Sequence, residues 1–203
     1  MAAIIPAPIP EQAFVSILQR IATILFEEMQ NQAAFAGLDT PKVFLDRTAR
    51  MDNSEVSPVA FNVTMERGNW DNQDVMVARG NYLYNIDIFA QSATFGQLES
   101  GRGDTLAMRT ATSVAGAVRY IFSHSKYYTL GYQPGYVHRR AVQSVQFHRP
   151  IDGMDANSMS MARIQLEVTA PEQEGVSEGV LISGYETNVK IGITDEGYQF
   201  TFL

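Results

Sequence analysis

The most conspicuous candidate for acid–base chemistry is a carboxylate in the middle of a predicted strand. Asp87 lies in NYLYNIDIFAQS, residues 81–92. A catalytic carboxylate must reach the proton that it transfers and usually works with a second positioned group. No other carboxylate stands at a spacing that selects it as the partner of Asp87. We therefore favour a salt bridge or a hydrogen bond at a protein interface over a catalytic role.

A glycine-rich stretch, GQLESGRGDT at residues 96–105, stands between a predicted strand and a predicted helix. Gly96 and Gly101 have the spacing of a phosphate-binding P-loop. Arg102 replaces its lysine, and Gly103 stands where a hydroxyl should bind Mg²⁺. We interpret the stretch as a loop that ends in Asp104 as the helix N-cap. The tripeptide Arg102-Gly103-Asp104 also matches a cell-adhesion motif, but we prefer the N-cap role of Asp104 to that interpretation.

The cysteine, histidine and serine patterns of the sequence do not indicate a metal site or a nucleophilic active site. The chain has no cysteine, which excludes thiol catalysis, disulfides and zinc–thiolate sites. His138 and His148 would lie about 33 Å apart on a straight strand. His124 falls at a predicted helix C-terminus, and no G-x-S-x-G elbow is present. We predict no cofactor, no metal and no enzymatic activity.

The charge of the chain argues against tight binding to nucleic acid. The net charge is −7; six acids against Lys190 give residues 171–203 a charge of −5, which leaves −2 for the other 170 residues. Phosphate-driven binding requires a basic surface. The sequence has one cluster of basic residues: His138, Arg139, Arg140, His148 and Arg149. We interpret it as part of a solvated or interfacial strand, with weak contact to a nucleic-acid backbone as the alternative. The stretch MAAIIPAPIP has no basic residue and its prolines interrupt the apolar run, so we expect no signal peptide and no membrane segment.

The elements that must position these residues follow from hydrophobic periodicity. Residues 1–10 predict an extended arm, residues 11–36 and 104–123 two helices, and residues 43–46, 58–66, 81–92, 137–148 and 158–169 strands. We predict a polar connection at 67–80 with a turn at Gly68 and Asn69 and an edge extension through Val75 and Val77. This order predicts an α+β fold, with a mostly antiparallel mixed sheet flanked by two main helices and an extra C-terminal β-hairpin. The domains are residues 1–10, 11–170 and 171–203.

Each helix has a predicted apolar stripe at helical spacing. The stripe of the first helix comprises Phe14, Ile17, Leu18, Ile21, Ile24, Leu25 and Met29. The stripe of the second comprises Leu106, Thr110, Val114, Ala117, Val118 and Ile121. Small residues make the second helix thin, which suits a helix that lies flat on a sheet; these are Ala107, Ala111, Ala115 and Gly116.

Two predicted strands have one core face and one face of mixed character. The core faces comprise Tyr82, Tyr84, Ile86, Ile88 and Ala90, and Ala162, Ile164, Leu166 and Val168. The mixed faces comprise Leu83, Asn85, Asp87, Phe89 and Gln91, and Arg163, Gln165 and Glu167. Partly apolar surfaces with scattered charges are typical of subunit interfaces. We therefore predict subunit contacts at Leu83, Asn85, Asp87, Phe89, Arg163, Gln165 and Glu167.

The order of these features resembles the tail terminator, or tail completion, proteins of long-tailed bacteriophages, both lambda-like and contractile. The resemblance rests on LQRIATILFEEM, KVFLD, SPVAFNVTME, NYLYNIDIFAQSA, DTLAMRTATSVAGAVRYI, VHRRAVQSVQF and SMARIQLEV. It covers residues 11–170 and includes no diagnostic catalytic or binding motif. Residues 171–203 lie outside it, and the aromatic connection at 126–136 is longer than the pattern implies.

The resemblance implies a virion protein of the tail and neck, assembled in the host cytoplasm. It implies a ring, typically a hexamer, that caps the head-proximal end of the tail tube, ends tube polymerisation and joins the tail to the neck. The implied partners are the tail tube protein and sheath and neck or connector proteins, with DNA passing through the lumen without specific binding. We assign the partner-facing loops to 67–79 and 149–157, with Trp70, Asp71, Asp152 and Asp155. The C-terminal hairpin would clasp a neighbouring subunit, a sheath protein or a neck protein through Tyr198, Phe200 and Phe202.

Two other functions stay open. The first is another phage neck, tube or sheath-associated subunit, which differs from a terminator in how it assembles. The second is a soluble enzyme or ligand-binding domain, which would need a pocket with convergent polar groups near Asp87.

Overall fold

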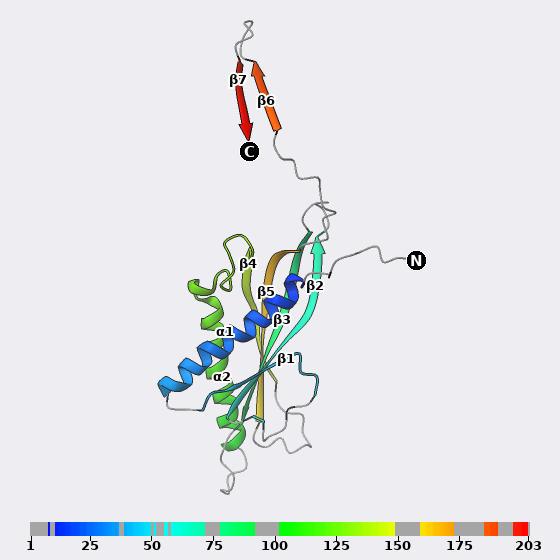
Figure 1. Cartoon of the computed structure of the whole chain (residues 1–203). Helices are drawn as coiled ribbons and strands as arrows, with labels where there is room; N and C mark the ends of the chain where they lie inside the picture. Colours follow the sequence, from blue (N-terminus) through cyan, green and yellow to red (C-terminus); the bar gives the residue numbers. More distant parts are fainter. Residues whose placement is uncertain are drawn as a thin grey trace, which may run out of the picture. The chain divides into compact units, whose positions relative to one another are not determined.

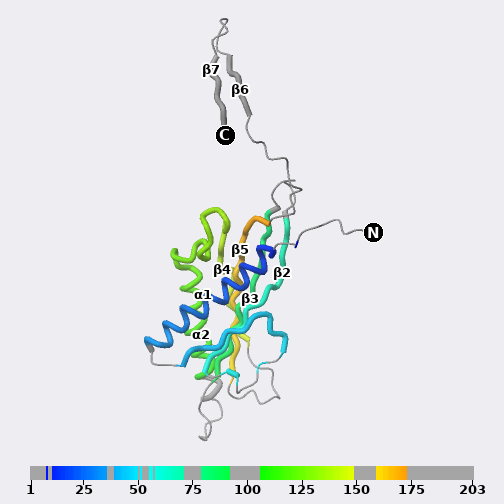
Figure 2. Tube along the Cα trace, viewed as in Figure 1, coloured from blue at the N-terminus to red at the C-terminus, as the bar shows by residue number. Residues whose placement is uncertain are grey.

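The computed structural model describes residues 8, 11–36, 39–49, 51, 55–56, 58–71, 78–91, 102–148, 159–172, 185–190 and 197–202 (Figure 1). Figure 2 follows the Cα trace of the part up to residue 172 in colour. The chain divides into two compact units, residues 1–173 and 174–203. The first unit therefore extends past the predicted boundary at residue 170. The reason is that its last strand continues to Glu172, so residues 170–172 are not part of a linker.

The first unit is built on a five-stranded sheet in the order β1-β2-β3-β5-β4 (Figure 1). The strands are β1 (Lys42–Leu45), β2 (Val59–Asp71), β3 (Ala78–Gln91), β4 (Arg139–His148) and β5 (Met159–Glu172). β1 pairs with β2 in parallel, and the other three pairings are antiparallel. The predicted α+β class with a mostly antiparallel mixed sheet is confirmed.

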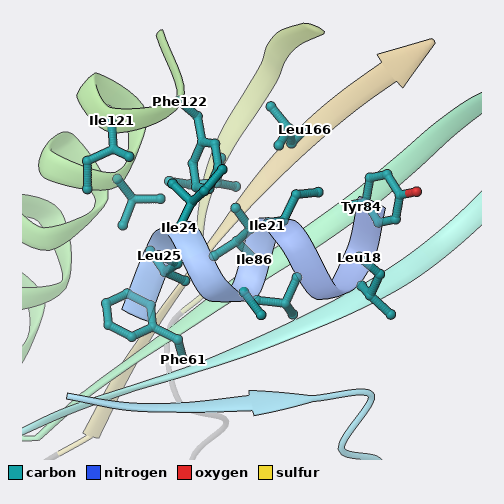
Figure 3. Packing of buried hydrophobic residues seen from close by; sticks show 14 of the residues in the cluster. Leu18, Ile21, Ile24, Leu25, Phe61, Tyr84, Ile86, Ile121, Phe122 and Leu166 are labelled. Atoms are coloured by element: carbon teal, nitrogen blue, oxygen red, sulfur yellow. The ribbon is translucent and has the colours of Figure 1, made fainter. Parts of the chain in front are cut away.

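Both helices, α1 (Ala13–Ala36) and α2 (Arg102–Ser123), pack on the same face of this sheet. α1 contacts chiefly β1 and β2, whereas α2 contacts β5, β3 and β4. Figure 3 shows the apolar side chains of α1 directed at the strands, with Phe122 of α2 beside them. The predicted stripe of α1 is confirmed, since Ile17, Leu18, Ile21, Ile24, Leu25 and Met29 are all buried.

The core face of the sheet matches the predicted alternation. Tyr82, Tyr84, Ile86, Ile88 and Ala90 of β3 are fully buried, as are the alternate residues of β5, Ala162, Ile164, Leu166 and Val168. A period of two places successive side chains on opposite sides of a strand. The two neighbouring strands therefore present one continuous apolar surface to the helices.

The predicted apolar stripe of α2 is wrong in part. The side of α2 that meets the sheet begins with Ala107, Ala111 and Ala115, which are buried, whereas Leu106 is exposed. Small side chains allow the helix axis to lie close to the strands, and larger ones at those positions would hold it away. The helix also begins at Arg102. Asp104 therefore lies inside the first turn and is not the N-cap that the sequence predicted.

β2 is longer than predicted, because the expected turn at Gly68 and Asn69 is strand. These residues pair with Tyr82 and Asn81 of β3. A bulge between Met65 and Arg67 shifts the register, which interrupts the alternation on which the sequence-based prediction depends. The predicted edge extension through Val75 and Val77 lies outside the described residues.

The second half of α1 contacts the short 3₁₀ helix η1 (Ser125–Tyr127), which follows α2. The Tyr127 hydroxyl donates a hydrogen bond to Glu28 Oε1, and Lys126 Nζ lies 3.2 Å from the same oxygen. The bond from Tyr127, together with Lys126, lowers the pKa of Glu28 below its ordinary value of 4.5.

This lowered pKa makes one contribution to stability dependent on pH. The folded state favours the ionised form of Glu28 more than the unfolded state does. The contribution of Glu28 to the free energy of unfolding is therefore present above pH 4.5 and is lost as pH falls through the lowered pKa. We expect Glu28→Gln to reduce the free energy of unfolding by about 1 kcal/mol at neutral pH. The difference between wild type and variant, measured in urea titrations, should shrink as pH falls below 4.5. A difference that is constant with pH would contradict this.

The second unit contains one antiparallel pair, β6 (Tyr185–Lys190) and β7 (Gly197–Phe202). A hairpin in this part of the chain is as predicted, and Val189 pairs with Tyr198. The sequence NVKIGITDEGYQFTF, in which Val189, Ile191 and Ile193 alternate, predicts a first strand from Asn188, whereas β6 begins at Tyr185. Ile191 and Ile193, which the sequence placed in the first strand, lie outside the described residues.

Candidate interaction surface

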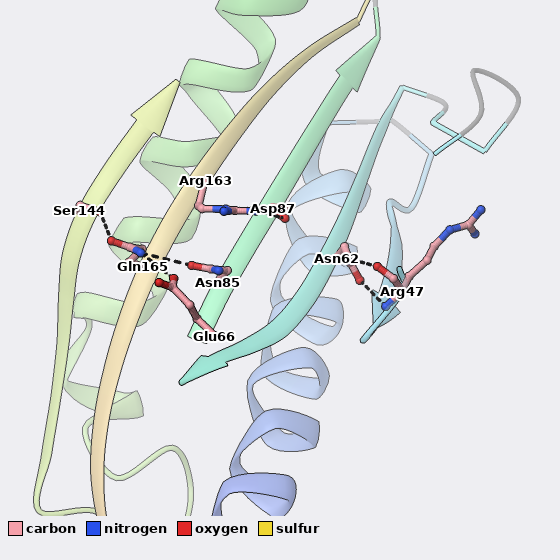
Figure 4. A network of polar contacts seen from close by, with 8 residues as sticks. All are labelled: Arg47, Asn62, Glu66, Asn85, Asp87, Ser144, Arg163 and Gln165. Atoms are coloured by element: carbon pink, nitrogen blue, oxygen red, sulfur yellow. Dashed lines mark hydrogen bonds and ion pairs between the residues drawn. The ribbon is translucent and has the colours of Figure 1, made fainter. Parts of the chain in front are cut away.

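The side of the five-stranded sheet opposite α1 and α2 has no helix over it in the described part of the chain. We call this side the open face. Figure 4 views it directly, with the helices behind the strands and polar side chains in front. Register aligns its residues in rows that cross β3 and β5: Asp87 lies opposite Arg163, Asn85 opposite Gln165, and Leu83 opposite Glu167. The polar residues that alternate along each strand therefore become neighbours across strands.

The strongest polar contact on the open face joins β3 to β5. Arg163 donates two hydrogen bonds to Asp87, Nε to Oδ1 at 2.6 Å and Nη2 to Oδ2 at 2.9 Å. Parallel bonds of this kind between a guanidinium and a carboxylate fix orientation as well as distance. The bond to Asp87 raises the pKa of Arg163 above its ordinary value. The guanidinium therefore keeps its charge, and the two hydrogen bonds make a structural contact between β3 and β5.

A second network centres on the Gln165 side chain. Its amide nitrogen donates to Glu66 Oε2 at 2.8 Å and, more weakly, to Asn85 Oδ1 at 3.5 Å. Its amide oxygen accepts from Ser144 Oγ at 2.9 Å. One side chain thus connects β2, β3, β5 and β4 (Figure 4). Such a network holds the outer polar layer in defined positions.

Near β1, the open face is partly covered by the chain itself. Asn62 closes a double hydrogen bond with the backbone of Arg47, at 3.1 and 2.9 Å. A small apolar cluster lies beside it, formed by Met51, Val56 and Ala60 with Phe44, Phe89 and Met159 packed against it. Phe89, a predicted subunit contact, therefore already packs within its own chain.

The predicted contact residues divide into two layers. Leu83, Asn85 and Asp87 are less than a tenth exposed; Arg163 bonds to Asp87, and Gln165 bonds to Asn85. Arg163, Gln165 and Glu167 are half-buried. Among the described residues, only Nε of Arg140 is a buried side-chain polar atom without a hydrogen-bond partner. The open face is thus internally satisfied, and the predicted contact residues of β5 are more exposed than Leu83, Asn85 and Asp87 of β3.

One end of the open face contains a pocket of about 490 Å³. Its lining comes from four adjacent strands: Asn69, Trp70, Arg79, Asn81, Arg139, Glu167 and Thr169. Arg139 Nη1 lies 3.9 Å from Glu167 Oε1, and Gln143 also donates to that carboxylate. Asp87 is not among the lining residues. This pocket is therefore not the one near Asp87 that the enzyme or ligand-binding alternative would need.

The structure places the other predicted residues as follows. Trp70 and Asp71 lie at the end of β2 and not in a loop. Trp70 is half exposed, with its ring against Phe14 and Tyr82 at centroid distances of 6.5 and 6.2 Å. Asp152 and Asp155 lie outside the described residues. Tyr198, Phe200 and Phe202 all belong to β7.

Among the described residues there is neither a metal-binding cluster nor a membrane-spanning helix. Within them, no three His, Cys, Asp or Glu side chains group as metal ligands would. The helices found in the same residues lack the length and hydropathy to cross a membrane. His124 acts locally, since its Nδ1 accepts from the backbone nitrogen of Lys126 at 3.2 Å.

Two residues of structural or functional interest were missed in the sequence. Arg79 continues the open face two residues before Asn81, and the signal was the same alternation extended backwards into the predicted connection. Glu172 was counted with the acidic extension, but it is buried and accepts from the backbone nitrogen of Ala13 at 3.0 Å. No local sequence signal distinguishes it from the solvent-exposed glutamates that follow.

No protein-family model and no curated protein matched the sequence.

Proposed function

We propose that this protein is a structural subunit that forms a ring at the head-proximal end of a phage tail, where it ends tube polymerisation and joins the tail to the neck. The observation that carries the proposal is the open face. A sheet with both helices on one side and an ordered, partly charged surface on the other is suited to contact a neighbouring protein. The sequence resemblance to tail terminators supplies the kind of assembly.

The proposed mechanism is one of shape and not of chemistry. Each subunit uses the open face against its neighbour, and a head-to-tail contact repeated around an axis closes a ring. One side of the ring matches the end of the tail tube. The other side does not, so no further tube subunit adds, and sheath and neck proteins bind there. The net charge of −7 disfavours adhesion of DNA to the lumen.

The test begins with the purified full-length chain. We expect light scattering over a concentration series to show one closed oligomer, or a monomer that closes when tail tubes are added. Negative-stain images should show rings, and added protein should stop tube growth at a fixed length. Unlimited stacking would instead assign the chain to tube proteins. A monomer that ignores both concentration and tail tubes would overturn the proposal.

A pair of matched variants locates the contact. Arg67 is exposed and lies opposite Leu83 in the β2–β3 register, on the open face, while Arg119 is exposed on α2. Arg67→Glu should weaken ring formation about tenfold, because reversing a rim charge opposes association. Arg119→Glu makes the same change on the helical side and should leave ring formation unaltered. The reverse result would place the contact on the helices.

A further inference from the structure

The pocket at the end of the open face has a charge opposite to that of the chain as a whole. Its lining holds Arg79 and Arg139 against one acid, Glu167. Arg67 and Asp71, the remaining charged residues in the last five positions of β2, add one charge of each sign. The local balance is therefore positive by one, in a chain of net charge −7.

The arginine groups of this pocket are available to a partner. The Arg139 side chain is 65% exposed, and its contact to Glu167 is long, at 3.9 Å. Glu167 is itself largely covered and also accepts from Gln143. Around the arginines, Asn69, Asn81 and Thr169 offer amide and hydroxyl groups. Two cationic groups beside neutral donors are suited to carboxylates on a peptide.

The complementary charge is in the second unit of the chain. Once Glu172 is assigned to the sheet, residues 174–203 hold five acids and one lysine, a net charge of −4. Asp195 and Glu196 are adjacent in the segment between β6 and β7, and no other two acids of this unit adjoin. A two-stranded hairpin is at best marginally stable in water. The hairpin therefore gains from a surface on which to dock.

We propose that the pocket binds the C-terminal hairpin of a second copy of the chain, with Asp195 and Glu196 facing Arg79 and Arg139. The proposal rests on the proposed ring, in which a strap from each subunit to the next would reinforce a head-to-tail contact. The eleven residues 174–184 can span up to about 36 Å when extended, which allows the hairpin to reach a neighbour.

The test uses charge reversal in full-length chains. A pocket variant carries Arg79→Glu and Arg139→Glu, and a hairpin variant carries Asp195→Lys and Glu196→Lys. Each alone should lower the association constant about tenfold or more, because like charges then face each other. Glu174→Lys with Glu178→Lys is the matched control in the same unit and should leave association unchanged.

Mixing distinguishes binding to a second copy from binding within one chain. An equimolar mixture of the pocket and hairpin variants restores the opposite charges only between different copies, so association should recover. One chain that carries all four reversals should also recover. The proposal is overturned if only the chain with all four reversals recovers. It is also overturned if Glu174→Lys with Glu178→Lys lowers association more than the pocket and hairpin variants do.

Cross-linking separates this inference from the proposed function. A photoreactive residue at Asn81, which lines the pocket, should cross-link to residues 185–203 of an isotopically labelled copy. Cross-links without tube termination would remove the phage function and keep the docking. Rings that terminate tubes, without cross-links and without any effect of the reversals, would remove the docking alone.

Discussion

Replacing Glu172 with alanine is expected to lower the free energy of unfolding by about 3–5 kcal/mol, because two buried donors lose their acceptor. Glu172 is 4% exposed at the end of β5. One carboxylate oxygen accepts from the backbone nitrogen of Ala13 at 3.0 Å, and the other accepts from the Tyr82 hydroxyl. Chemical denaturation of wild type and variant at neutral pH provides the measurement.

The position of Glu172 explains the size of this effect. Ala13 is the first residue of α1, and the unpaired backbone N–H groups at a helix N-terminus favour a negative charge. Burial, together with the bond to Glu172, raises the pKa of Tyr82 well above its ordinary value of 10. The tyrosine therefore stays a donor at every pH of interest. The carboxylate thus links the start of α1, the middle of the sheet and the last residue of β5.

Three further variants test this explanation. Glu172→Gln keeps one acceptor oxygen and should lose about half as much. Gly80→Ala leaves Glu172 in place, but its Cβ would lie 1.7 Å from the Tyr82 hydroxyl and must displace it. This variant should therefore also be destabilised, by about 1–3 kcal/mol. Glu27→Ala, at an exposed position of α1, is the control and should change stability by less than about 0.5 kcal/mol. A Glu172→Ala effect as small as the control would contradict the assignment.

Much of the fold follows from the sequence, because one-sided burial produces a regular period. The Ile17–Met29 stripe and the alternation of Tyr82 to Ala90 were predicted and are buried as predicted. The errors occur where local pattern and tertiary packing differ. The bulge after Met65 breaks the alternation of side chains, so the sequence pattern does not predict the second half of β2 as strand. In α2, close approach to the sheet selects Ala107, Ala111 and Ala115 over the larger Leu106.

The sequence predicted which residues share the open face, but not which of them contact each other. Alternation assigns Asp87 and Arg163 to the mixed faces of two strands. Their pairing requires β3 and β5 to be neighbours and in one register, although they are 76 residues apart in the chain. Sequence distance carries no information on that register, which is fixed by the buried faces. For the same reason, Arg79 and Arg139 were not associated before the strand order was known.

The ion pair between Asp87 and Arg163 should carry the second large effect. We expect Asp87→Ala to cost about 2–4 kcal/mol, less than a fully buried pair would, because the Arg163 side chain is 33% exposed and can regain water. The Asp87 side chain is only 8% exposed, so its contact with Arg163 is shielded from solvent on one side. Urea denaturation of both chains at neutral pH measures the difference.

The double replacement Asp87→Leu with Arg163→Met decides whether the loss comes from an unpaired charge or from the pair itself. Removing both charges should cost less than removing Asp87 alone, since no uncompensated guanidinium is left. Arg139→Ala is the matched control on the same face, because Arg139 is 65% exposed and 3.9 Å from Glu167. Its effect should stay below about 1 kcal/mol. If Asp87→Ala costs no more than Arg139→Ala, the pair is a surface contact, and the open face is held by the Gln165 network and apolar packing instead. If the double replacement costs more than Asp87→Ala, the loss cannot come from an unpaired Arg163. The bidentate pair itself then stabilises the sheet.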